Sequence, residues 1–281
     1  MNRLLIFGLG YSGTAIAKAA RAAGFEVVGT SRDGAPGTIR FDAAQAAIAS
    51  ATHLLTTAAP DNGGDPVLAR YRDAIDAAPE LRWVGYLSTT AVYGNRDGGW
   101  VDEATPPAPT QERGMARLNV EHDWATFANR RAVDIFRLAG IYGPGRSALD
   151  DVRAGRARRI IKPGHQFGRI HRDDIAQAVM AAMRQNPPPG SRIFNLADDV
   201  PAESALVVES AANLLGAPLP PAYDFAEIEA DMRPLARSFW AENRKVSSQQ
   251  TKAVLGIEWR YPSYREGLAA ILAEEAGKGS P

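Results

Sequence analysis

Short apolar runs alternate along this chain with longer segments whose hydrophobic residues recur at helical spacing. Seven of the runs are predicted strands, at residues 4–7, 26–30, 38–41, 53–57, 83–88, 134–138 and 192–196. Helical patterns occupy residues 13–23, 66–78, 112–129 and 173–184. Such alternation is typical of βαβ units. We therefore expect an α/β fold: a Rossmann-type, doubly wound, seven-stranded parallel sheet with helices on both faces.

A glycine-rich turn joins the first predicted strand to the first predicted helix. Gly8 permits a tight turn, Gly10 lets a phosphate approach the backbone, and Gly13 lets the helix lie close to the strand. Tyr11 and Ser12 stand at the helix start, where free N–H groups and a partial positive charge favour phosphate. The turn therefore predicts a dinucleotide site. The alternative is an ordinary strand-turn-helix in which the glycines serve packing alone.

The composition narrows the classes of function. The 281 residues are 45% hydrophobic and 23% charged, as in ordinary globular proteins, and the formal net charge is zero. This balance gives no support for binding to nucleic acid or to a membrane surface. The chain has no cysteine and four scattered histidines, which excludes disulfides and thiol catalysis and disfavours a metal site. A first strand near residue 3 leaves no room for a signal peptide, so we expect a cytoplasmic protein.

Charge is uneven in the second half of the chain. Residues 146–172 hold eight basic and two acidic side chains, whereas residues 197–231 hold eight acidic side chains and no Lys or Arg. Two solvated faces would explain this distribution, and so would an anion-binding lid over a cleft. Charge alone leaves both interpretations open.

Several separated motifs follow the glycine turn. Residues 87–94 read Leu-Ser-Thr-Thr-Ala-Val-Tyr-Gly, residues 137–145 read Arg-Leu-Ala-Gly-Ile-Tyr-Gly-Pro-Gly, and residues 170–176 read Ile-His-Arg-Asp-Asp-Ile-Ala. Residues 194–197 and 247–268 add a strand motif and a C-terminal motif. In this combination the chain resembles the short-chain dehydrogenase/reductase superfamily, and more narrowly its extended, NAD-dependent epimerase/dehydratase-like branch. The resemblance covers nearly the whole sequence.

The resemblance implies two structural parts. Residues 1–145 with residues 169–197 would form the NAD(P)-binding Rossmann domain, and residues 146–168 with residues 198–281 a smaller substrate-binding lobe. Ile141 would line the cofactor site, and Tyr93, Arg146 and Arg169 would bind substrate. Relatives with nucleotide-sugar substrates use arginine for the diphosphate, which suits bidentate guanidinium contacts and favours the anion-binding interpretation. The resemblance also implies a homodimer, paired through the helices at 66–78 and 112–129.

One departure from the family pattern bears on catalysis. The family uses a Tyr-x-x-x-Lys pair after the fifth strand, in which Tyr is the acid/base and Lys lowers its pKa and holds the nicotinamide ribose. Here Gly114 and Glu121 set a register that places Arg113 and Arg117 at those positions, while Thr89 keeps the usual hydroxyl. A guanidinium keeps its proton to a pH of about 12 or above, so Arg113 cannot replace the tyrosine. Arg117 can still bind a ribose hydroxyl or a phosphate.

Other side chains are candidates for the missing acid or base. They are Tyr93, Tyr142, His171, Glu103 and Glu112. The alternative for the tyrosines is packing and for the histidine a helix cap. The acids are equally explained as solvated side chains. The sequence does not choose among them.

The end of the second predicted strand bears on the choice of cofactor. An NAD site usually carries Asp or Glu there, but this chain has Ser31 followed by Arg32, which fits the 2′-phosphate of NADP. We therefore predict NADP, with NAD as the alternative because Asp33 could serve a ribose hydroxyl. Asp42 is expected to accept a hydrogen bond from the adenine amino group. Three residues are expected to line the ribose and pyrophosphate path: Ala58, Ala59 and Pro60.

Two functions remain open at this point. The first is an NAD(P)-dependent oxidoreductase or epimerase-like enzyme with an atypical active site, acting on a small anionic or sugar-derived substrate. The second is a non-catalytic NAD(P)-binding protein with a regulatory or scaffold role. The missing Tyr and Lys favour the second, whereas Thr89 and the complete substrate lobe favour the first.

Overall fold

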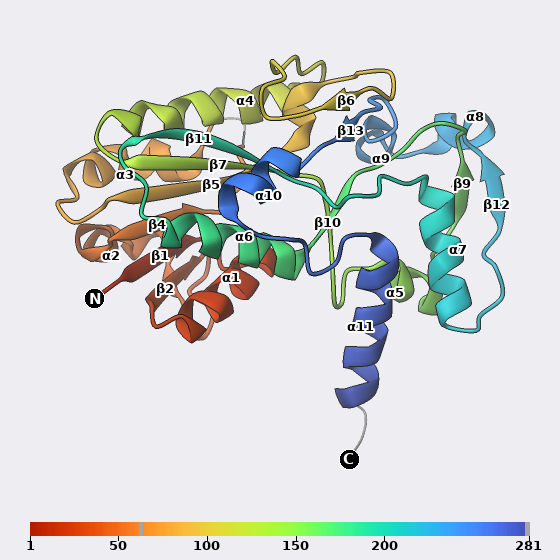
Figure 1. The fold of residues 1–281 in the computed structure, drawn as a ribbon, viewed down its shortest axis with the longest axis horizontal. Helices are drawn as coiled ribbons and strands as arrows, with labels where there is room; N and C mark the ends of the chain where they lie inside the picture. Colours follow the sequence, from red (N-terminus) through yellow and green to blue (C-terminus); the bar gives the residue numbers. More distant parts are fainter. Residues whose placement is uncertain (62–63, 279–281) are drawn as a thin grey trace.

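The fold is built on a seven-stranded parallel sheet, which the computed structural model places in the order β11-β7-β5-β4-β1-β2-β3 (Figure 1). The structure describes residues 1–61 and 64–278. The strands are β1 (Arg3–Phe7), β2 (Glu26–Ser31), β3 (Ile39–Arg40), β4 (His53–Thr56), β5 (Trp83–Thr89), β7 (Ala132–Leu138) and β11 (Gly190–Leu196). The α/β class and all seven predicted strands are confirmed. The third strand is shorter than expected because Phe41 begins a 3-10 turn.

Helices cover both faces of the sheet. The four predicted helices are present, as α1 (Tyr11–Ala22), α3 (Pro66–Ala77), α4 (Glu112–Ala125) and α6 (Arg172–Arg184), and a short α2 (Gln45–Ser50) is added to them. In Figure 1, α1 and α6 lie on one side of the sheet and α3 and α4 on the other. Among the described residues, no helix is both long enough and apolar enough to cross a membrane.

The start of α3 shows how local chemistry sets a helix boundary. Pro66 occupies the first turn, and one carboxylate oxygen of Asp65 accepts hydrogen bonds from the N–H groups of Val67 (2.8 Å) and Leu68 (3.0 Å). The other oxygen accepts a hydrogen bond from the Trp124 indole of α4 (3.1 Å). One buried carboxylate therefore caps α3 and ties it to α4.

Each face of the sheet carries its own hydrophobic core, and β5 serves both. Trp83 and Leu87 pack into the core beneath α1 and α6, whereas Val84 and Tyr86 pack into the core beneath α3 and α4. A strand buried on both faces reads as an unbroken apolar run rather than an alternating one. This explains why the pattern of residues 83–88 predicts a strand so clearly.

The remaining elements form a second lobe and three small sheets. The helices are α5 (Ala148–Arg153), α7 (Ser204–Leu214), α8 (Phe225–Ile228), α9 (Pro234–Ser238), α10 (Gln249–Leu255) and α11 (Tyr264–Lys278). The parallel strand pairs are β8 (Gly140–Tyr142) with β10 (Arg169–His171), β9 (Arg159–Ile161) with β12 (Ala222–Asp224), and β6 (Trp100–Val101) with β13 (Lys245–Val246). Figure 1 shows α5, α7, β9 and β12 gathered beyond one end of the large sheet.

The C-terminal segment does not stay in the second lobe. β13 pairs with β6, and Leu255 and Trp259 pack in the same core as Ile175 and Val179 of α6. We therefore place residues 245–259 with the sheet, because they bury apolar side chains there. The rest of the predicted division into a Rossmann domain and a substrate lobe stays a proposal.

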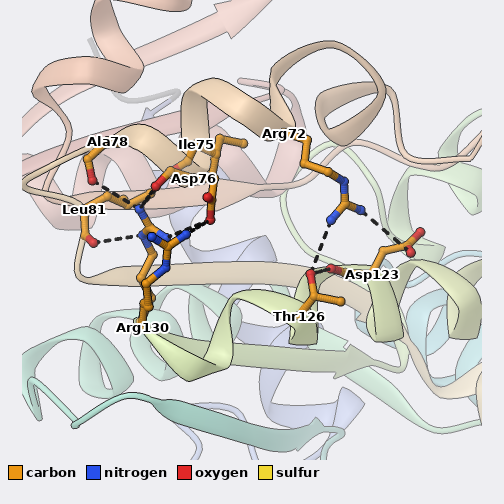
Figure 2. Close-up of polar contacts among 9 residues, drawn as sticks. Arg72, Ile75, Asp76, Ala78, Leu81, Asp123, Thr126 and Arg130 are labelled. Atoms are coloured by element: carbon orange, nitrogen blue, oxygen red, sulfur yellow. Dashed lines mark hydrogen bonds and ion pairs between the residues drawn. The ribbon is translucent and has the colours of Figure 1, made fainter.

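Arg131 links the end of α3 to the start of β7. Its buried guanidinium donates hydrogen bonds to the carbonyl oxygens of Ile75 (2.8 Å), Ala78 (3.2 Å) and Leu81 (3.1 Å). Figure 2 shows these carbonyl groups at the end of the helix. The last carbonyls of a helix have no intrahelical partner, so a buried arginine can satisfy them.

Ion pairs cross the outer surface between α3 and α4. Arg72 of α3 lies 3.8 Å from the Asp123 carboxylate of α4, and Arg130 pairs with Asp76 (Figure 2). These charged side chains are partnered within one subunit. The homodimer expected through the same two helices stays a prediction.

The buried His53 is expected to make folding sensitive to acid. It is 2% exposed, and burial, with a smaller contribution from Arg82, lowers its pKa to about 4. In the unfolded chain His53 takes up a proton below a pH of about 6.5, whereas the folded protein keeps it neutral. The free energy of unfolding is therefore unaffected by His53 above that pH and falls as the pH drops from about 6.5 toward 4. Urea unfolding at pH 7 and at pH 4.5 measures how much stability each protein loses on acidification. The loss for His53→Gln should be smaller than that for the unaltered protein by about 2 kcal/mol. Equal losses would contradict the assignment.

Candidate functional site

The glycine turn has the geometry that a dinucleotide requires. Gly8 adopts φ +90°, and a Cβ at Gly13 would lie only 2.5 Å from the Gly8 carbonyl oxygen, so side chains are excluded at both positions. A Cβ at Gly10, in contrast, would meet no atom within 4 Å. The backbone before α1 is therefore open at Gly10, where the helix N-terminus offers its N–H groups. These residues fit a bound pyrophosphate.

The strand order brings a second segment to the same turn. β1 lies between β2 and β4. The chain places β2 and β3 on one side of β1 and then crosses over to place β4, β5, β7 and β11 on the other side, so the order of parallel strands switches between β1 and β4. Ligands of open α/β sheets bind outside the carboxyl ends of the strands at such a switch point. Thr57 spans it, because its hydroxyl donates a hydrogen bond to the Gly8 carbonyl oxygen (2.6 Å). The expected lining residues Ala58, Ala59 and Pro60 follow directly, after β4.

The side chains expected at the adenosine end lie together beyond β2. The Ser31 hydroxyl is 2.8 Å from the Thr38 hydroxyl and accepts a hydrogen bond from the Ala35 N–H (2.8 Å), so it stabilises its own loop. Arg32 is exposed. The pairing register places Arg40 of β3 beside Ser31. This position was not among those predicted.

Asp42 is exposed at this end of the sheet and already has a partner. Its two carboxylate oxygens accept hydrogen bonds from Arg40 Nε and Nη2, both at 3.1 Å. The same guanidinium is the largest cause that lowers the Asp42 pKa. Adenine would therefore meet an aspartate that Arg40 holds in place.

The three residues expected at the reacting end come together. Arg117 of α4 donates hydrogen bonds to the Leu87 carbonyl oxygen of β5 (2.8 Å) and to the Tyr86 hydroxyl (3.1 Å). Thr89 ends β5, and its hydroxyl oxygen accepts from the Ala91 N–H (3.2 Å), which leaves the hydroxyl proton free to donate. Arg113 lies one helical turn before Arg117 on the same face of α4.

Tyr93 does not reach this site. The side chain is fully buried, and its hydroxyl donates to Asn195 Oδ1 (2.7 Å). The Arg137 guanidinium lies 4.8 Å from the centre of its ring. Tyr93 is therefore part of a buried polar network, and we withdraw the prediction that it contacts substrate.

Two other acid/base candidates have structural partners. The Tyr142 hydroxyl donates to the Ser263 carbonyl oxygen (3.3 Å), and burial raises its pKa above the ordinary value. His171 Nδ1 accepts from the Asp173 N–H (3.2 Å) and caps α6, while burial lowers the pKa of His171 to about 4. A neutral histidine that caps a helix and an un-ionised tyrosine both fit structural roles at the edge of the site.

The two acidic candidates lie in different environments. Glu103 lines a separate cavity of about 370 Å³ beside the outer strand β11, where its carboxylate accepts from the Thr251 hydroxyl (2.5 Å) and the Asn195 N–H (3.2 Å). Glu112 is exposed in the first turn of α4. In the described ranges of the chain, no cluster of three His, Asp or Glu side chains could hold a metal ion.

Arg146 and Arg169 line the same cavity, as the anion-binding interpretation expects. The cavity has a volume of about 430 Å³ and is lined by residues of β8, β10, α5, α7 and α11 and of the loops beside them. Its charged lining residues are Arg146, Arg156 and Arg169, together with Asp150 and Asp151. The Arg146 guanidinium also lies 5.7 Å from the Tyr11 ring centre, and the Tyr11 hydroxyl donates to the Pro144 carbonyl oxygen (3.1 Å). The cavity therefore adjoins the glycine turn.

Known proteins share this arrangement. No family model matches the sequence. A functionally unknown conserved protein from Silicibacter pomeroyi has a structure with a TM-score of 0.90 and 45% sequence identity, covering 98% of this chain and 99% of that one. The human epimerase family protein SDR39U1, solved with NADPH, has a TM-score of 0.81 at 21% identity, over 96% of this chain and 99% of that one. The strand order, the motifs and these likenesses agree. This chain belongs to the same family as the Silicibacter pomeroyi protein, and it shares the fold of SDR39U1.

Its fold is that of NAD-dependent epimerase/dehydratase-like proteins. The structure of MoeE5 with UDP-glucuronic acid and NAD has the same fold, with a TM-score of 0.79 and 21% identity over 98% of this chain and all of that one. That likeness concerns the fold alone. The side chains that the sequence places at the Tyr and Lys positions are arginines, and Arg117 bonds to the Leu87 carbonyl oxygen of β5.

Three residues of this site were not predicted. Thr57 could have been predicted from the sequence, because it directly follows a strand. Arg40 could not, because its place beside Ser31 depends on the register of β3 against β2. Tyr264 comes to the cavity from the far end of the sequence. Ile141, which the family pattern assigns to the cofactor, lies in β8 between the sheet and the cavity-lining residues.

Proposed function

We propose that this protein binds NADP at the glycine turn and acts as an oxidoreductase or epimerase-like enzyme on a small anionic or sugar-derived substrate. The observation that carries the proposal is the open backbone at Gly10 between two positions that only glycine can occupy. That turn lies at the switch point of the sheet, next to a cavity lined by arginines. The cofactor, when bound, would supply hydride chemistry. The NADPH in the SDR39U1 structure and the NAD in that of MoeE5 support a nicotinamide dinucleotide.

The protein's own residues would bind and orient the reactants. The N–H groups at the start of α1 would hold the pyrophosphate, and the Thr89 hydroxyl would donate a hydrogen bond to a substrate oxygen. Arg146 and Arg169 would hold an anionic part of the substrate in the cavity. The UDP-glucuronic acid of MoeE5 is one such anionic sugar compound. We further propose a homodimer and a cytoplasmic location, and gel filtration at monomer mass would reject the former.

Arg32 is expected to set the preference for NADP. Arg32→Ala should weaken NADPH binding about tenfold or more, because a guanidinium-phosphate contact is charge-assisted, while NADH binding changes by less than about twofold. Fluorescence titration with each cofactor measures both constants. Arg184→Ala, which removes an exposed arginine at the end of α6, is the matched control. Tighter NADH binding that Arg32→Ala leaves unaltered would overturn the NADP assignment.

Turnover is the test of the enzymatic part of the proposal. Purified protein with NADP or NADPH is expected to turn over at least one member of a panel of sugars, nucleotide sugars and small carbonyl compounds. A net oxidation or reduction changes the 340 nm absorbance, whereas an epimerisation, which leaves the cofactor unchanged, is detected by chromatography of the product. Cofactor binding without turnover across the panel would instead favour a regulatory or scaffold role.

A further inference from the structure

Arg113 and Arg117 stand on one face of α4 without a carboxylate partner. Within residues 1–61 and 64–278, neither guanidinium has an Asp or Glu oxygen within 4.0 Å. The Arg117 charge acts to lower the pKa of Asp65, which burial raises. Both carboxylate oxygens of Asp65, however, already accept hydrogen bonds, from the start of α3 and from Trp124. Arg113 is exposed and Arg117 half-buried, whereas the fully buried Arg137 binds Glu121 at 2.7 Å.

Each of the two guanidiniums is held by a neutral group. Arg117 donates to the Tyr86 hydroxyl and to the Leu87 carbonyl oxygen, and it keeps further N–H groups free. The Arg113 guanidinium lies 5.7 Å from the centre of the Phe239 ring, which belongs to the segment after α9. A cation held against an aromatic face keeps its donors for another partner. Burial and the Arg117 charge both lower the Arg113 pKa, so the two cations destabilise each other.

The pair stands beside the reacting end of the site. Gly114, between the two arginines, packs so closely on the loop after β5 that a Cβ there would lie 2.9 Å from the Ala91 carbonyl oxygen. This contact brings the first turn of α4 against the turn that follows Thr89 at the carboxyl end of β5. β5 neighbours β4, which flanks the switch point. A group bound by Arg113 and Arg117 would therefore lie next to Thr89.

We infer that Arg113 and Arg117 bind an oxyanion that the substrate itself carries, a carboxylate or a phosphate, beside the atom that reacts. Two guanidinium forks one turn apart offer parallel N–H donors to such a group. The Thr89 hydroxyl is then left for the neighbouring substrate oxygen. This inference rests on the proposed function, since it places the anion next to the bound cofactor. It defines the substrate class as compounds with an anionic group adjacent to the reacting hydroxyl or carbonyl.

The test uses two small anions and a neutral analogue of one of them. NADPH-loaded protein is titrated with glycolate, with its neutral analogue glycolamide and with inorganic phosphate at constant ionic strength. Bound-NADPH fluorescence reports binding near the nicotinamide, and the melting temperature is a second readout. We expect glycolate or phosphate to bind about tenfold more tightly than glycolamide. The tighter of the two anions identifies the oxyanion.

Variants separate this inference from the proposed function. Arg113→Gln should remove about tenfold of the anion preference and leave NADPH affinity within about twofold, whereas Arg184→Gln should change neither. Equal affinity for glycolate, phosphate and glycolamide in a protein that binds NADPH would overturn the inference alone. An Arg113→Gln protein that loses NADPH affinity instead would show that the arginines hold the cofactor, which also overturns it. Failure to bind NADPH at all would overturn the proposed function, and with it the placement of the anion.

Discussion

Gly10→Glu is expected to leave the protein folded and to weaken NADPH binding by about a hundredfold or more, which corresponds to about 3 kcal/mol. The fold should tolerate the change because a Cβ at Gly10 meets no atom within 4 Å. The new carboxylate would stand at the N-terminus of α1, where a negative charge is stabilising for the helix. It would occupy the position proposed for the pyrophosphate and repel it. Fluorescence titration and a thermal melt together measure the two effects.

The control for this variant adds the same charge to the same helix. Ala22 is exposed at the last position of α1, so Ala22→Glu should change NADPH affinity by less than about twofold, because it lies far from the turn and its charge is screened. If Gly10→Glu bound NADPH as tightly as the unaltered protein, the pyrophosphate could not lie where we place it.

Glu121→Gln is expected to destabilise the protein by about 3 to 5 kcal/mol, because it leaves the Arg137 charge buried and uncompensated. Both side chains are 2% exposed and lie 2.7 Å apart. The Ser88 hydroxyl also donates to Glu121 (2.5 Å), and Arg137 packs over the ring of Tyr93. The pair thus holds together α4, the two central strands and the turn after β5. Urea unfolding at pH 7 measures the change in the free energy of unfolding.

Two further variants test the cause of that loss. Asp123→Asn removes an exposed carboxylate from the same helix, and its weak pair with Arg72 at 3.8 Å predicts a loss below about 1 kcal/mol. Glu121→Leu combined with Arg137→Met removes both buried charges and should recover much of the stability that Glu121→Gln loses. A loss below about 1 kcal/mol for Glu121→Gln would show that the pair is not the buried ion pair described here.

Periodicity predicted the central sheet well because its strands are buried on both faces. Residues 83–88 are a nearly continuous apolar run and residues 53–57 a short apolar pair flanked by His and Thr, and they became β5 and β4 within one residue at each end. The two-residue strands β6 and β13 were not predicted. They are too short to show a period, and they pair across a separation that only tertiary structure brings together.

Site residues were predictable where a backbone requirement shows in the sequence. Gly8 has a positive φ, and Gly13 approaches the Gly8 carbonyl oxygen too closely for a side chain. Both positions therefore require glycine, which the sequence shows directly. Tyr93 was misassigned because a Tyr-Gly motif does not reveal which way its side chain points, and here it points to Asn195. Arg40 was missed because its role depends on strand register. The return of residues 245–259 to the sheet depends in the same way on packing that no local pattern encodes.

The central claim is that a dinucleotide binds across this switch point with arginines at its reacting end. A crystal structure of the protein with NADPH tests it most directly. We predict the pyrophosphate at the N-terminus of α1, the 2′-phosphate beside Arg32, and the nicotinamide near Thr89 and Arg117. A dinucleotide bound elsewhere, or no bound dinucleotide at saturating NADPH, would contradict the account.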